Sequence, residues 1–135
     1  MALCLIDSSV WIDWFRGRES PATATVERLV RQPEVLATTQ PVLMELRFGA
    51  APAALSRIEQ VMNSLVQLDV DPAIDFHQAA DLFRAVRRSG HTVRSAIDCL
   101  IASVALRHDV VLMYKDVDYE RIAAVAPNLR TQMLD

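Results

Sequence analysis

Short apolar runs alternate with longer amphipathic segments along the chain. The runs, whose length is typical of buried strands, cover residues 2–6, 34–38, 66–70 and 110–114. Between them, apolar residues recur at helical spacing, which predicts helices at 9–16, 23–31, 41–64 (interrupted and restarted at Pro52), 72–89, 95–108 and 118–125. An edge strand is predicted at 128–132. Alternating strands and helices indicate an α/β fold with a mostly parallel sheet of about four or five strands.

Composition favours one folded domain over residues 1–135. The chain is 52% hydrophobic and 23% charged, which permits a sizeable core and argues against disorder. A net charge of −3 excludes the strongly basic profile of a passive nucleic-acid binder, but not an enzyme that gathers acids in its site. Cys4 and Cys99 are interpreted as reduced core thiols. With no signal peptide and no apolar stretch of membrane-spanning length, we expect a cytoplasmic protein without membrane contact.

Four acids fall where the predicted strands end or the following helices begin. Asp7 and Asp116 directly follow strands, and Glu45 and Asp98 lie in early turns of helices. Because helices that connect parallel strands begin at the rim where strands end, all four should lie at the carboxyl edge of one sheet, where α/β folds bind ligands.

Each acid alone has a simpler explanation, since Asp7 and Asp116 suit helix N-caps and Ser95-x-x-Asp98 matches a capping box. Together these explanations weaken. Asp98 aligns with an apolar helix stripe, and Glu45 shares a face with Val42 and Phe48, so both acids should be partly buried, at a cost.

Acids that converge repel one another unless a cation neutralises them. Oxygen ligands without nearby His or Cys favour Mg²⁺, or Mn²⁺, over Zn²⁺. Such a site suits phosphodiester hydrolysis, with the hydroxyls of Ser8, Ser9 and Ser95 available to orient carboxylates.

Four segments appear together, in order: LIDSSVWID at 5–13, PVLMEL at 41–46, SAIDCLIA at 95–102 and KDVDYERI at 115–122. The chain thereby resembles the PIN-domain nucleases, in particular the VapC-like toxins of bacterial toxin–antitoxin pairs. The resemblance implies a three-layer sandwich with helices on both faces of the sheet. It also implies a Mg²⁺-dependent endoribonuclease that inhibits translation and growth, neutralisation by a cognate antitoxin, and a homodimer.

The resemblance assigns metal-site roles to Asp7, Glu45, Asp98 and Asp116, with Ser9 as a supporting hydroxyl. Tyr114 departs from the Thr or Ser that family members often carry there, so one supporting hydroxyl is expected to be lost or displaced. Asp118 is a second candidate beside Asp116. We prefer Asp116, which is nearer the strand end, and expect Asp118 to cap the last helix.

A basic stretch precedes Asp98, and within it Arg94 and Arg88 are candidates to hold RNA phosphates. Arg88 equally suits the last turn of a helix, where cations complement the dipole. Trp11, Trp14 and Phe15 form an aromatic stripe. We expect at least one Trp in the core, and the stripe can also line an antitoxin groove. Asp13 is interpreted as a solvated residue.

Two other functions remain as alternatives. An aspartate-nucleophile phosphatase or receiver domain is weak, because position 9 is Ser where the phosphatase needs a second Asp. A non-catalytic RNA-binding or protein-interaction module would keep the fold without the chemistry. The full set of four acids argues against that module, whereas Tyr114 keeps it open.

Overall fold

The computed structural model describes residues 2–135 and shows an α/β fold. One sheet contains five strands in the order β3-β2-β1-β4-β5, and every neighbouring pair is parallel. In chain order the elements are β1 (Cys4–Ile6), α1 (Ser8–Phe15), α2 (Pro21–Leu29), η1 (Pro33–Val35), β2 (Leu36–Thr38), α3 (Gln40–Phe48), α4 (Pro52–Asn63), β3 (Val66–Gln67), α5 (Asp75–Arg88), α6 (Ala96–His108), β4 (Val111–Tyr114), α7 (Val117–Val125) and β5 (Thr131–Met133).

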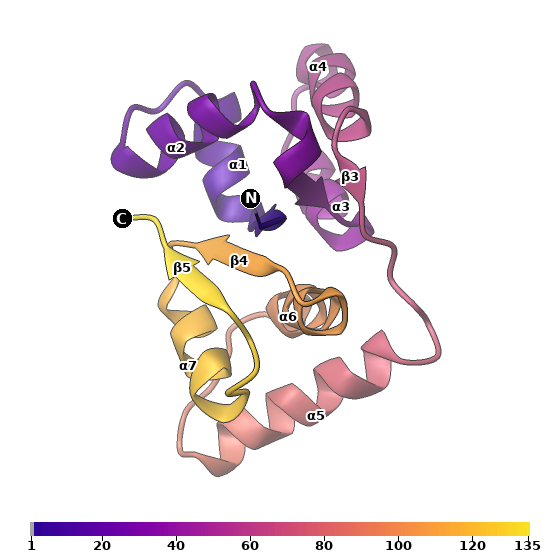
Figure 1. Ribbon diagram of the computed structural model, residues 1–135, viewed down its shortest axis with the longest axis vertical. Coiled ribbons are helices and arrows are strands. Elements are labelled where there is room, and N and C mark those ends of the chain that lie inside the picture. Colours follow the sequence, from indigo (N-terminus) through magenta and orange to yellow (C-terminus); the bar gives the residue numbers. More distant parts are fainter. Residues whose placement is uncertain (1) are drawn as a thin grey trace.

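Helices α1 to α4 gather on one side of β4 and β5, and α5 to α7 lie on the other (Figure 1). Strand β1 lies at the centre, with all three of its residues buried, as its unbroken apolar run predicts. The predicted fold class is confirmed. Among the described residues, no helix has the length and apolarity to cross a membrane.

Proline explains the main differences from the predicted boundaries. Pro33 begins a short 3₁₀ helix, so β2 starts only at Leu36. The segment predicted as one interrupted helix at 41–64 forms two helices, and Pro52 occupies the first turn of the second. Strand β3 is shorter than predicted, and both its residues are exposed because it is an edge strand of the sheet.

The core confirms the predictions for the thiols and for one tryptophan. Cys4 and Cys99 are free and buried. Trp11 is fully buried, whereas Trp14 and Phe15 are only partly buried. Asp13 was expected to be solvated, and this prediction is wrong: it is buried and pairs with Lys115 and Arg18. No local pattern indicated this pairing, because Lys115 follows Asp13 by 102 residues.

A second buried acid, Asp75, joins α5 to α6. Its carboxylate accepts hydrogen bonds from Arg107 Nε (3.1 Å) and Nη2 (2.8 Å), from Ser103 Oγ (2.8 Å) and from the Asp71 backbone N–H (2.8 Å). Burial raises the pKa of Asp75, but the hydrogen bonds from Arg107, Asp71 and Ser103 together lower it by more, so the net shift of the pKa is downward. This acid is therefore charged and fully satisfied inside the fold.

Candidate active site

Three of the four predicted acids meet at the carboxyl edge of the sheet. Asp7, Glu45 and Asp98 each offer a carboxylate oxygen within 4.8 Å of the other two. They come from three places in the chain, the end of β1, the second turn of α3 and the first turn of α6. Parallel strands with returning helices bring these positions to one rim, as the strand order requires.

Asp7 is the most tightly held of the three acids. It is buried and serves as the N-cap of α1, where Ser9 donates to its Oδ2 from the backbone N–H (3.1 Å) and from Oγ (2.6 Å). The Tyr119 hydroxyl donates to its other oxygen at 2.6 Å. Asp7 is thus both a cap and a site residue, so the simple explanation and the functional one do not exclude each other.

Glu45 and Asp98 have fewer donors and are unfavourably placed as anions. Burial raises the pKa of Glu45, the hydrogen bond from Ser8 (2.6 Å) lowers it, and the charge of Asp7 raises it again, with a net upward shift. Burial, and then the charges of Asp7 and Glu45, raise the pKa of Asp98 to about 7. The expected partial burial of Glu45 holds, but Phe48, expected on the same face, is 71% exposed.

The donor set fits a hard divalent cation. The three carboxylates of Asp7, Glu45 and Asp98 offer oxygen ligands close together, and no side-chain cation bonds to any of them among the described residues. A cation at this point would offset the repulsion that raises the pKa of Asp98.

Asp116 lies outside this group of three. It is the N-cap of α7 and accepts from the Asp118 backbone N–H at 2.9 Å. Arg94 Nη2 also donates to both of its oxygens, at 2.8 and 2.6 Å. Asp116 is nevertheless close enough for its charge to contribute to the raised pKa of Asp98.

The prediction that Asp118 caps the last helix is wrong, because Asp116 takes that position. Asp118 lies in the first turn of α7, where it is almost fully buried. It accepts from the backbone N–H (3.0 Å) and Nε (3.2 Å) of Arg94. Arg94, a candidate RNA contact, is therefore held in place by hydrogen bonds to both Asp116 and Asp118. Arg88, the other candidate, is exposed in the last turn of α5.

Sequence reasoning missed Tyr119. This fully buried residue of α7 donates to Asp7, and its hydroxyl oxygen also lies 3.2 Å from Asp98 Oδ1. Burial and the neighbouring acids raise the pKa of Tyr119 well above its ordinary value, so it stays a neutral donor. Tyr114, where a supporting hydroxyl was expected to be lost, packs against it with ring centroids 5.5 Å apart. A signal was present, since Tyr119 directly follows the Asp-x-Asp of the last segment.

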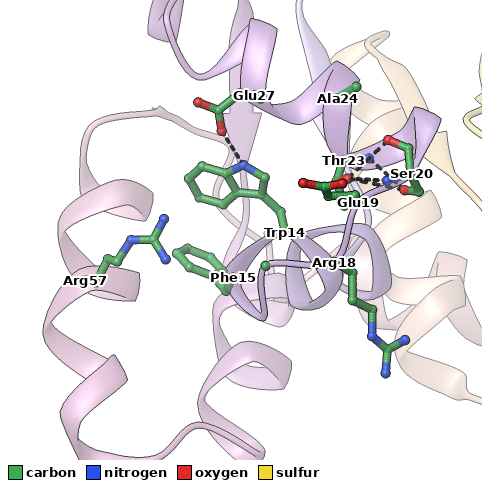
Figure 2. A pocket seen from close by; sticks show the side chains of 10 residues that line it. Trp14, Phe15, Arg18, Glu19, Ser20, Thr23, Ala24, Glu27 and Arg57 are labelled. Carbon is green, nitrogen blue, oxygen red and sulfur yellow. Dashed lines mark hydrogen bonds between the residues drawn. The ribbon is translucent and has the colours of Figure 1, made fainter.

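Two neighbouring hollows lie along α1, and one of them reaches the acid group. Glu45 lines the first, a cavity of about 290 Å³ that Ile12, Phe15 and Leu46 also line. Phe15 lines the second too, a cavity of about 540 Å³ between α1, α2 and α4. Figure 2 shows Trp14 donating to Glu27 (2.8 Å), with Arg57 beside the aromatic rings. The Arg57 guanidinium carbon is 4.9 Å from the Trp14 ring centroid, within the range of a cation–π interaction.

A model of the PIN domain matches residues 4–125 of the chain. The chain belongs to the PIN-domain family, which confirms the resemblance carried by the four segments.

Its relatives include VapC ribonucleases. Ribonuclease VapC11 from Mycobacterium tuberculosis is 41% identical over 125 residues, covering 91% of this chain and 93% of that protein. VapC ribonuclease Mb1587 from Mycobacterium bovis matches with the same identity and coverage.

Solved structures show the same fold at lower identity. DNA-bound VapBC from Salmonella typhimurium has a TM-score of 0.79 at 21% identity, covering 100% of both chains. VapBC2 from Rickettsia felis, bound to a DNA fragment from its promoter, has a TM-score of 0.76 at 19% identity, covering 98% of this chain and 99% of that one.

Proposed function

We propose that this chain is a metal-dependent endoribonuclease that hydrolyses RNA phosphodiester bonds and is the toxin of a toxin–antitoxin pair. The observation that carries the proposal is the meeting of Asp7, Glu45 and Asp98 within 4.8 Å at the carboxyl edge of the sheet. The VapC ribonucleases at 41% identity support RNA as the substrate. In this role the protein acts in the cytoplasm, where cleavage of RNA inhibits translation and growth.

Each acid has a defined part in this proposal. Asp7, Glu45 and Asp98 hold Mg²⁺, or Mn²⁺ in its place, through their carboxylate oxygens. When bound, the cation supplies Lewis acidity to the scissile phosphate and to the attacking water. Ser9 orients Asp7, and Ser8 orients Glu45, through hydroxyl bonds of 2.6 Å. Fixed carboxylates reduce the reorganisation needed when substrate arrives.

Asp116 completes the site, and Arg94 meets the RNA beside it. Asp116 adds negative charge at the edge of the group and so strengthens its attraction for a cation. Arg94 is 71% exposed at its side chain while its Nε stays fixed to buried Asp118, so its outer face is available to a phosphate. Arg88 adds a more distant and weaker phosphate contact.

The antitoxin occupies the two hollows beside the site. Phe15 lines both hollows, and Glu45, one of the three acids, lines the smaller. An antitoxin segment that lay along α1 in both hollows would therefore reach the acid group. Aromatic side chains such as Trp14 are favoured anchors for a partner. A protein bound there would block the RNA from reaching the acids.

A homodimer is part of the proposal, and the surface between α3, α5 and α6 supports it. There Met44, Phe76, Phe83, Ile97 and Leu100 line an apolar hollow of about 540 Å³. Met44 and Phe76 are 41% and 56% exposed, and clustered apolar side chains of this kind are unfavourable in water but typical of protein interfaces. Light scattering should give the mass of a dimer, and Phe76→Asp should shift it to the monomer.

Cleavage assays test the proposed reaction. The purified protein is incubated with single-stranded RNA, structured RNA and DNA, each with Mg²⁺, Mn²⁺ or EDTA, beside Asp98→Asn. We expect cleavage of RNA that requires the cation and disappears in the variant. If a folded protein that binds cation cleaves none of these, the non-catalytic interaction module is the better interpretation. If Asp98→Asn cleaves as well as the unmodified protein, the acid site is not the catalyst.

A further inference from the structure

One buried hydroxyl connects two of the three acids. The Tyr119 oxygen is 2.6 Å from Asp7 Oδ1 and 3.2 Å from Asp98 Oδ1. Among the hydrogen bonds of residues 2–135, it is the one side-chain group that reaches two members of the acid group. Asp7 and Asp98 belong to elements distant in sequence, so this contact fixes a distance that no local structure sets.

The position of Tyr119 leaves its hydroxyl little freedom. The residue has no exposed surface, and its ring packs against the buried ring of Tyr114. It lies in the first turn of α7, the helix capped by Asp116. A buried phenol in a packed environment is restricted to its rotamer, so the two carboxylate oxygens have a fixed reference point.

The Tyr119 hydroxyl contacts the carboxylates and is not itself one of the proposed cation ligands. Ser9 donates twice to Oδ2 of Asp7 and Tyr119 donates once to Oδ1, which leaves the second lone pair of Oδ1 and the oxygens of Asp98 to face a cation. Without the Tyr119 hydroxyl, Asp7 would lose the donor on Oδ1 and the phenol oxygen would no longer lie between the two acids, so the repulsion between Asp7 and Asp98 would favour moving apart. The hydroxyl therefore acts on cation binding through the acids and not as a ligand.

We propose that Tyr119 is a positioning residue whose hydroxyl holds Asp7 and Asp98 at the spacing needed to bind one divalent cation. This inference rests on the proposed function. It extends it by assigning a role to a residue of α7 outside the carboxylate set. Removal of the hydroxyl should weaken cation binding in a protein that keeps its fold, because groups that orient ligands typically contribute about 10–100-fold in metal affinity.

Mn²⁺ titration calorimetry tests the inference. Four proteins are compared: unmodified, Tyr119→Phe, Tyr114→Phe and Asp98→Asn. Tyr114→Phe is the matched control, since it removes the same hydroxyl from the adjacent buried ring, which bonds to none of the three acids. Circular dichroism and thermal unfolding verify that each variant is folded. We expect Mn²⁺ affinity about 10–100-fold weaker in Tyr119→Phe, near the unmodified value in Tyr114→Phe, and lost in Asp98→Asn.

The outcomes separate the two proposals. If Asp98→Asn loses Mn²⁺ binding but Tyr119→Phe binds as tightly as the unmodified protein, or more tightly, the role of Tyr119 is wrong and the acid site stands. An equal loss in both tyrosine variants also contradicts it, because a general packing effect would then explain both. If the unmodified protein binds no Mn²⁺, both proposals fail.

A spectroscopic measurement covers the case in which Tyr119→Phe does not fold. The chain has two tyrosines, so in Tyr114→Phe any tyrosine signal belongs to Tyr119. Saturating Mn²⁺ should change the near-ultraviolet tyrosine absorption of that variant, because the hydrogen bonds of the hydroxyl change when the acids bind the ion. A spectrum without tyrosine change at saturation would overturn the inference.

Discussion

Asp75 and Asp98 are both acids withdrawn from solvent, but their surroundings differ in one respect. Asp75 has a cation of its own, because Arg107 donates two hydrogen bonds to it, and its pKa is lowered. Asp98 has a tyrosine hydroxyl and two acidic neighbours, and burial together with those charges raises its pKa to about 7. Arg94, which shortly precedes Asp98 in the chain, bonds to Asp116 and Asp118 instead.

The difference distinguishes a structural acid from a functional one. A buried carboxylate that the fold satisfies contributes to holding α5 and α6 together. A buried carboxylate that is surrounded by other acids lowers the stability of the fold, and such an arrangement is typical of a site where a bound ligand offsets the repulsion. The comparison therefore predicts opposite consequences when each region is altered.

The largest expected effect is on activity at the acid group. Asp7→Asn keeps an N-cap for α1, since Asn caps as well as Asp, but removes the charge. We expect RNA cleavage to fall roughly 1,000-fold, because several kcal/mol of transition-state stabilisation depend on the cation. Stability without the cation should not fall, because Asn keeps the cap and loss of the charge relieves the repulsion that raises the pKa of Asp98. Cleavage assays and urea unfolding check both values; near-normal cleavage would show that Asp7 is only a cap.

Breaking the ion pair between Asp75 and Arg107 should lower stability and leave activity per folded molecule nearly unchanged. Asp75→Asn leaves Arg107 without its counter-charge in a site where its side chain is 24% exposed. We expect a loss of about 3 kcal/mol in the free energy of unfolding. Cleavage per folded molecule should stay near normal. Urea unfolding measures the first effect and a cleavage assay at low temperature the second, and a stable but inactive variant would reverse the assignment of the two regions.

The two acids should also give the stability of the cation-free protein opposite pH dependences. Asp98 has a folded pKa of about 7, above the unfolded value of about 3.9, so the folded state binds more protons between these values. Stability should fall as pH rises through that window, by roughly 1–4 kcal/mol. Asp75 has a lowered pKa, so its contribution is present above pH 3.9 or so and is lost as pH falls further.

Urea unfolding in EDTA at mildly acidic and mildly alkaline pH measures the Asp98 contribution. Asp98→Asn should flatten the decline, whereas Asp75→Asn should leave it. A decline that survives in Asp98→Asn would assign it to another group, and Glu45, whose pKa is also raised, is the next candidate.

The smallest expected effect concerns Arg94, the arginine beside the acid group. Arg94→Gln removes a phosphate contact, so KM for RNA should rise several-fold and the salt dependence of binding should weaken by about one charge. Arg88→Gln, at an exposed position farther along the chain, is the control and should have less effect. An unchanged KM would restrict Arg94 to pairing with Asp116 and Asp118.

Periodicity was sufficient to predict an α/β fold with a mostly parallel sheet, because the strands and helices are short and regular, whereas the helix layers on both faces were predicted from the family resemblance. The rim position of Asp7, Glu45 and Asp98 followed from the same pattern, since parallel strands and returning helices fix which residues share an edge. The local signals failed where a tertiary contact decides. Local position allowed either Asp116 or Asp118 to cap α7, and the contacts of Asp118 with Arg94, from another part of the chain, were not predictable.

Tyr119 and Asp13 show the same limit. Tyr119 follows the Asp-x-Asp of the last segment, but only the packed fold places its hydroxyl beside two carboxylates. Asp13 looks solvated by its helix position, yet Lys115 reaches it from the end of β4. Pairings across long sequence separations leave no periodic signal in a single sequence.

Thermal unfolding with and without Mn²⁺ tests the central claim most directly, using the unmodified protein, Asp98→Asn and Asp75→Asn. A ligand that binds only the folded state stabilises it, by about 2.7 kcal/mol at 100 times its Kd. We predict that Mn²⁺ raises the Tm of the unmodified protein and, from a lower starting value, that of Asp75→Asn, but leaves Asp98→Asn unchanged. An equal rise in Asp98→Asn, or no rise in any of the three, would contradict a cation site built from Asp7, Glu45 and Asp98.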